Sequence, residues 1–111
     1  MPSLVIHAPD YQVYENDKKS FKDTFETGVG RGYALNSTIL RQIPSVDRVV
    51  LLCKDKRRRA EGDLVKLEPA TKDGKPWFTN NHIRRYDVYV ENFKLVPYRF
   101  EELNRNGVAV I

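Results

Sequence analysis

A run of five apolar residues, Val49 to Cys53, ends directly at a cluster of basic residues, Lys54 to Arg59. Successive side chains of an extended chain point to opposite faces, so a strand made of such a run is buried on both faces. We therefore expect a central strand over Val46 to Lys54. The chain must then turn at Asp55 to Arg58, and the pattern of Arg59 to Leu67 predicts a return strand. The pair is interpreted as a β-hairpin whose tip carries the basic cluster.

Other strands are expected at both ends and in the last third of the chain. Ser3 to Ala8 is a short β-branched run closed by Pro9-Asp10, and Gly107 to Ile111 is a short apolar run. Arg85 to Val96 is the longest alternating pattern, with an irregularity expected at Glu91-Asn92. Between the long strands, Ala70 to Pro76 is predicted to be a loop because it contains an Asp-Gly turn signal.

Helices are expected to be few and short. The first is predicted over Asn16 to Glu26, with Asn16 or Asp17 as the N-cap and Gly28 past its end. The second begins at Asn36 or Ser37 and ends near Gln42, since Pro44 prevents its continuation. Pro97 to Asn104 is interpreted as one helical turn or slightly more.

Five strand candidates and two or three short helices, without a regular strand–helix–strand alternation, predict an α+β fold. We expect a mostly antiparallel, partly closed barrel of five or six strands. A chain of 111 residues fits one domain over residues 1–111, able to fold without disulfides or metal. Cys53 is the only cysteine, and its place in the apolar run predicts a buried, inert thiol. No zinc site or cofactor is expected.

The N-terminal residues lack the basic leader and cleavage site of a secretory signal. Apolar runs are also far shorter than the roughly 20 residues that cross a bilayer. A cytoplasmic location without membrane contact is the expectation from these features.

The positive charge of the chain is concentrated in one place. Lys and Arg number 19 and Asp and Glu 15, a net charge of +4, and residues 54–59 alone carry five basic residues against Asp55. The remainder is neutral, with 14 residues of each sign. A local cluster of cations favours a polyanion as partner, and Arg and Lys on a turn can hold the phosphates of RNA or DNA. An acidic protein partner is the alternative, and a solvated turn that protects the hairpin is the simplest explanation.

Two further features could contribute to such a site. The stretch Gly28 to Gly32 contains three glycines, which allow close backbone approach to a ligand, and Arg31 lies in its middle. It matches neither a P-loop nor a dinucleotide-binding fingerprint, so a structural turn is an equally open reading. Aromatic residues such as Tyr11, Tyr14 and Trp77 fall in expected loops, where exposed rings can stack on bases.

The sequence offers little for catalysis. His7 and His82 are the only histidines, and no nucleophile, metal or phosphate-transfer motif accompanies them. Glu61 and Asp63 beside the basic cluster are expected to form cross-strand ion pairs, and the adjacent Glu101-Glu102 a solvated face. A small nuclease or hydrolase that uses His7 or His82 is the least favoured alternative, and we expect no enzymatic activity.

The order of these segments resembles the PUA-like superfamily, particularly its EVE branch. The resemblance covers residues 28–104 and is carried by Gly30-Arg31-Gly32-Tyr33, Asp47-Arg48-Val49-Val50-Leu51, Ala60-Glu61-Gly62-Asp63-Leu64-Val65, Tyr86-Asp87-Val88-Tyr89-Val90 and Leu95-Val96-Pro97 with Phe100-Glu101-Glu102-Leu103. It implies a pseudo-barrel that binds RNA or modified bases in DNA. It also implies a base pocket lined by the glycine stretch and the facing strands.

We therefore expect a non-catalytic nucleic-acid-binding module, in which the basic hairpin holds phosphates and a glycine- and aromatic-lined pocket holds a base. The sequence leaves open whether the target is RNA or DNA, whether a modified base is recognised, and what the oligomeric state is. The expected contacts are Arg31, Tyr33, Asn36, Lys54, Lys56, Arg57, Arg58, Arg59 and Trp77.

Overall fold

A computed structural model of the chain describes residues 2–10 and 20–111. Within these ranges the elements follow in the order β1 (Ser3–His7), α1 (Phe21–Thr27), β2 (Val29–Ala34), α2 (Ser37–Gln42), the 3₁₀ helix η1 (Ile43–Ser45), β3 (Arg48–Cys53), β4 (Arg58–Pro69), β5 (Thr71–Lys72), β6 (Lys75–Pro76), β7 (Arg85–Val96) and β8 (Val108–Val110). The expected α+β composition is confirmed.

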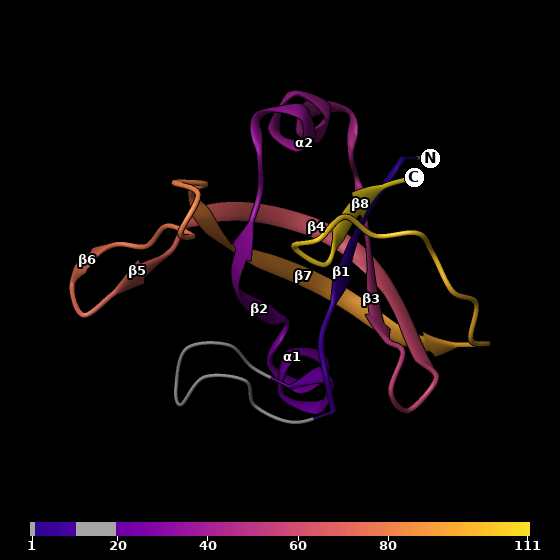
Figure 1. Ribbon diagram of the computed structural model, residues 1–111. Coiled ribbons are helices and arrows are strands. Elements are labelled where there is room, and N and C mark those ends of the chain that lie inside the picture. Colours follow the sequence, from indigo (N-terminus) through magenta and orange to yellow (C-terminus); the bar gives the residue numbers. More distant parts are fainter. Residues whose placement is uncertain (1, 11–19) are drawn as a thin grey trace.

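Six of the strands form one curled sheet, in the order β2-β7-β4-β3-β1-β8 (Figure 1). The long strands β4 and β7 bend across the molecule, and the sheet forms a half-barrel with β2 and β8 at its edges. The sheet is mixed, because β1 lies parallel to β3 while β1–β8, β2–β7, β3–β4 and β4–β7 are antiparallel. A parallel pair needs a long crossover, and the segment through α1, β2 and α2 supplies it.

The apolar run forms the central strand that the sequence predicts. All residues from Val49 to Cys53 are buried, and β3 lies between β4 and β1. It pairs with β4 from Arg48↔Asp63 to Cys53↔Arg58, so the chain turns over residues 54–57. The expected hairpin with a basic tip is therefore present. Its second strand is longer than expected and reaches Pro69, because β4 continues past β3 to pair with β7.

The long strand β7 has the predicted bounds and the predicted irregularity. Asn92 has a φ of +58°, and the register with β4 shifts between Glu61 and Asp63. Gly62 faces this bulge, where a Cβ atom would lie 2.7 Å from the Glu91 carbonyl oxygen. The expected loop before β7 is a small hairpin of β5 and β6, and its Asp-Gly turn has positive φ at both residues, as a type I′ turn requires.

Both helices begin at a polar cap. The α1 helix starts later than predicted, since the Ser20 hydroxyl accepts a hydrogen bond from the Asp23 N–H; Asn16 and Asp17 lie outside the described residues. Its end at Gly28, with φ of +74°, is as predicted. The Asn36 side chain caps α2 by accepting from the Ile39 N–H at 2.9 Å, and the helix begins at Ser37, the second of the two expected starting points.

Two segments differ from the expectation. No strand is predicted over the glycine-rich stretch, but Val29 and Gly30 pair with β7 as part of β2, and the register shifts only between Gly30 and Tyr33. Residues 97–104 contain no helix. The Arg59 guanidinium donates to the Arg99 carbonyl oxygen at 2.8 Å, so this carbonyl is held by a side chain instead of a helical N–H.

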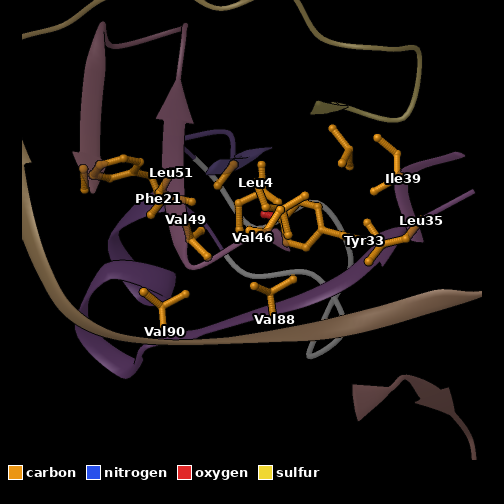
Figure 2. Close-up of a cluster of buried hydrophobic side chains, with 14 of the residues drawn as sticks. Leu4, Phe21, Tyr33, Leu35, Ile39, Val46, Val49, Leu51, Val88 and Val90 are labelled. Atoms are coloured by element: carbon orange, nitrogen blue, oxygen red, sulfur yellow. The ribbon is translucent and has the colours of Figure 1, made fainter. Parts of the chain in front are cut away.

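The core lies on the concave side of the sheet. Leu4, Val49, Leu51 and Val88 meet Tyr33 there, and the helices add Phe21 and Ile39 (Figure 2). Cys53 is fully buried, as expected of a structural thiol. Among the described residues, no helix is both long and apolar enough to cross a bilayer.

Candidate nucleic-acid interface

Four cations form an exposed surface at the β3–β4 turn. Lys54, Lys56, Arg57 and Arg58 are all exposed, with Asp55 as the only anion in the turn, and we call these four side chains the basic turn surface. Lys56 lies 3.9 Å from Asp10, but the two side chains are 56% and 37% exposed, so water screens this pair. The turn therefore presents a strong local positive potential to solvent.

Arg57 is held in place on this surface by an aromatic ring. Its φ of +51° places it in the left-handed region, and its guanidinium carbon lies 4.7 Å from the centroid of the Tyr98 ring. Such a cation–π contact leaves the guanidinium edge available for hydrogen bonds. Tyr98 follows β7 in an irregular segment, and its contact with the turn is not visible in the sequence, because 41 positions separate the two residues.

Arg59 faces the interior and does not belong to the exposed cluster. Its side chain is 3% exposed, and it donates to Glu61 at 3.1 Å and to Glu101 at 3.0 Å. Arg99 also donates to Glu101 at 3.0 Å. Burial raises the pKa of Glu101, but the hydrogen bonds from Arg59 and Arg99 outweigh it and hold the pKa below its usual value. Arg59 and Glu101 are therefore structural, which corrects the expectation of a phosphate-binding Arg59 and of a solvated Glu101.

A hollow of about 480 Å³ lies beside the turn. Its walls comprise Arg57, Arg58, Arg59, Phe21, Lys22, Phe25, Glu26, Leu95 and Val96. The rings of Phe21 and Phe25 stack with centroids 6.3 Å apart. Leu95 is 64% exposed. The α1 helix thus adds a cation and apolar contacts to the turn. Sequence analysis missed Lys22 and Leu95, because only the tertiary fold brings α1 and the end of β7 against the turn.

The glycine stretch and its arginine have internal partners. Arg31 forms an ion pair with Asp87 at 2.9 Å and donates to the Thr71 carbonyl oxygen. Asp87, 6% exposed, also accepts from the Gly32 N–H at 3.1 Å. Tyr33 is 1% exposed, and burial raises the pKa of its hydroxyl well above the usual value. Its ring packs in the core and has no surface to offer to a base.

The expected base pocket and the basic turn do not come together. Trp77 lies beside the end of β4, where its N–H donates to the Ala70 carbonyl, whereas the basic turn precedes the start of β4. The β4 strand has 12 residues and therefore spans about 35 Å at 3.3 Å per residue. The β5–β6 hairpin and the β3–β4 turn lie at opposite ends of the sheet (Figure 1). Arg31 and Trp77 therefore belong to a region separate from the phosphate-binding candidates.

Asn36 provides a test that separates a cap from a ligand contact. Because its carboxamide caps α2, we expect Asn36→Ala to lower the free energy of unfolding by about 1 kcal/mol in urea denaturation. Ser37→Ala is the control, since Ser37 is the exposed next residue. Oligonucleotide affinity should stay unchanged in both variants. A fall in affinity without loss of stability would instead assign Asn36 to the binding surface.

The carboxylates Glu61 and Asp63, beside the basic cluster, form ion pairs with arginines. Arg48 on β3 lies 2.7 Å from Asp63 and 3.9 Å from Glu61 on β4, so the expected cross-strand pairing is confirmed. Glu61 also forms an ion pair with Arg59 on its own strand. Hydrogen bonds from Asn92 and Arg48 lower the pKa of Asp63. Within residues 2–10 and 20–111, no group of three or more His, Cys, Asp or Glu side chains is arranged to hold a metal ion.

The fold and this surface define a small α+β protein with a curled half-barrel sheet and a cationic hairpin. Comparison with protein-family models, curated proteins and solved structures found no match for the chain.

Proposed function

We propose that this chain is a non-catalytic nucleic-acid-binding module of the PUA-like kind, which holds the phosphates of RNA or DNA on its basic turn surface. The observation that carries the proposal is the density of exposed charge, with four exposed cations among the five residues from Lys54 to Arg58. Cations so close together repel one another, and a phosphate backbone relieves that repulsion and gains entropy from released counterions.

The geometry beside the turn supports the same function. Arg57 is pre-ordered on Tyr98, so less side-chain entropy is lost when its guanidinium binds a phosphate. Lys22 adds a cation across the hollow. The curled sheet with short helices agrees with the resemblance to PUA-like domains, which supports the proposal at the level of architecture.

Removal of two cations from the turn tests the proposal. We expect Arg57→Gln combined with Arg58→Gln to lower oligonucleotide affinity about tenfold or more at low salt. The slope of log affinity against log salt should also flatten by about 1.4 to 1.8, the contribution of two phosphate contacts. Fluorescence anisotropy with labelled single-stranded and duplex RNA and DNA measures both quantities and identifies the preferred target.

A double variant with the same loss of charge provides the control. Arg41→Gln with Lys75→Gln removes two exposed cations from α2 and β6, which lie away from the turn (Figure 1). Its affinity and salt slope should stay close to those of the wild type. Equal effects of the two double variants would refute a specific role of the turn.

An acidic protein segment is the second candidate partner, and the exposed Leu95 beside Arg57 and Arg58 favours it. Such a segment would place carboxylates on the turn and an apolar side chain in the hollow. Leu95→Ser should weaken binding of an acidic leucine-containing peptide and leave oligonucleotide affinity unchanged. Binding of this peptide, together with no oligonucleotide binding at low ionic strength, would replace the first proposal with the second.

A further inference from the structure

The segment that joins β7 to β8 begins beside the basic turn surface, because Val96 at the end of β7 pairs with Arg59 at the start of β4. It runs from there to β8 without forming a helix or a strand (Figure 1). We call residues 97–104 the strap. Tyr98 and Leu103 of the strap pack against a second apolar cluster, separate from the main core. This cluster comprises Val5, Val50 and Leu52.

Two arginines of the β3–β4 hairpin contact the strap. Arg59 is buried and donates to the Arg99 carbonyl oxygen at 2.8 Å and to Glu101 at 3.0 Å. Arg57 is exposed, and its guanidinium carbon lies 4.7 Å from the centroid of the Tyr98 ring. The hairpin that carries the basic turn surface and the strap are therefore joined by one buried contact and one exposed contact.

The exposed contact involves a residue whose backbone conformation is unfavourable. Arg57 has a φ of +51°, a value that L-residues rarely adopt and that persists only where surrounding contacts support it. Within the part of the chain that the structure describes, no carboxylate forms an ion pair with Arg57. The Tyr98 ring therefore directs this guanidinium without neutralising it.

We propose that Tyr98 is a positioning residue for phosphate binding and that docking of the strap sets the affinity of the basic turn surface for nucleic acid. Tyr98 orders the Arg57 guanidinium before a strand arrives, so less side-chain entropy is lost on binding. Strap docking and phosphate binding then favour each other, and this coupling is reciprocal. The inference rests on the proposed function and adds to it the element that regulates the site.

Replacement of the ring tests the role of Tyr98. Tyr98→Leu keeps an apolar side chain on the cluster and removes the ring, so we expect oligonucleotide affinity at low salt to fall about threefold to fivefold, the effect of one exposed cation–π contact. Tyr98→Phe should restore the affinity of the wild type, because the ring and not the hydroxyl lies under the guanidinium. Fluorescence anisotropy with the labelled oligonucleotides measures both variants.

The same substitution in a second background separates positioning from a general structural effect. In an Arg57→Gln variant, Tyr98→Leu should cause no further loss of affinity, because the cation that the ring positions is already absent. The other three cations of the basic turn surface remain, so binding is still measurable. An equal loss of affinity with and without Arg57 would show that Tyr98 acts only through the sheet.

The reciprocal effect is measured by hydrogen exchange of the strap. Oligonucleotide binding should slow the exchange of residues 98–104 in the wild type. Leu103→Ser removes an apolar anchor of the strap far along the chain from the turn, and it should raise this exchange and lower oligonucleotide affinity about twofold or more. Phe100→Ser is the matched control on the strap, since Phe100 is 51% exposed, and it should change neither quantity.

The outcomes distinguish this inference from the proposed function. If the wild type binds no oligonucleotide at low ionic strength, the proposed function fails and this inference fails with it. If the wild type binds and the Arg57→Gln, Arg58→Gln variant binds more weakly, the proposed function stands. In that case, wild-type affinity of Tyr98→Leu, or strap exchange that bound oligonucleotide leaves unchanged, would overturn this inference alone.

Discussion

Replacement of Arg59 by methionine is expected to lower the free energy of unfolding by about 3 kcal/mol, in the range found when one partner of a buried ion pair is removed. Arg59 is 3% exposed and makes three hydrogen bonds, to Glu61, Glu101 and the Arg99 carbonyl. Its loss leaves Glu101, 17% exposed, with fewer donors. It also releases the segment after β7, which Arg59 holds through Arg99.

The neighbouring arginine provides the control for this prediction. Arg58 is exposed, so Arg58→Met should change the free energy of unfolding by no more than about 0.5 kcal/mol. Urea denaturation at neutral pH compares the two variants, and hydrogen exchange of residues 98–104 should rise in Arg59→Met alone. Similar stabilities of the two variants would contradict the structural role of Arg59.

The pH dependence of this cluster follows from Glu101. Because its pKa is lower in the folded protein than in the unfolded chain, the ionised carboxylate stabilises the fold above the unfolded pKa, about 4.3. That contribution is lost as the pH falls through the lowered pKa of the folded state. The stability difference between wild type and Arg59→Met should therefore shrink under acid conditions.

Gly32→Ala is expected to have an effect of similar size, about 3 kcal/mol. Gly32 has a φ of +74°, a conformation that costs an L-residue roughly 1 to 2 kcal/mol. The added methyl group would also lie 2.3 Å from Trp77 Cζ3, and overpacking of this kind costs roughly 1 to 3 kcal/mol. Hydrogen bonds hold the Trp77 backbone, so the indole can yield only by rotation about its side-chain bonds.

Gly74 separates the two causes. Its φ of +75° is nearly the same, but a Cβ atom there would meet no atom within 4 Å. Gly74→Ala should therefore cost about 1 kcal/mol, the conformational part alone. The Trp77 emission should change in Gly32→Ala and not in Gly74→Ala. Equal losses of stability, measured by urea denaturation, would show that the indole yields without cost.

Local patterns in the sequence predicted most strands, because each of these patterns depends only on residues that are neighbours in the chain. The apolar run of β3, the alternation of β7 and the Asp-Gly turn before it are local signals, and the structure contains each of them. The same holds for the end of α1 at Gly28. The basic hairpin could also be predicted, because the basic cluster lies between two predicted strands and must therefore form the turn that joins them.

The errors concern residues whose conformation depends on distant partners. Arg31 lies in a strand and not in a ligand-binding glycine turn, and Asp87, 56 positions away, binds its guanidinium and the Gly32 N–H. The segment after β7 is held by Arg59, and no local pattern in Pro97 to Asn104 could reveal that contact. Five of the six residues from Lys54 to Arg59 are basic, and the sequence does not indicate that Arg59 alone among them is buried.

The sequence by itself determined the central strand, the hairpin and the concentration of charge at its tip, because period, turn chemistry and charge are properties of neighbouring residues. Only the tertiary structure decided that Arg59 turns inward, that α1 adds Lys22 and a hollow to the turn, and that Trp77 lies beside the end of β4, away from the turn. Such arrangements depend on the curvature of β4 and β7 and on side chains that meet across it. These are relations between residues far apart in the chain.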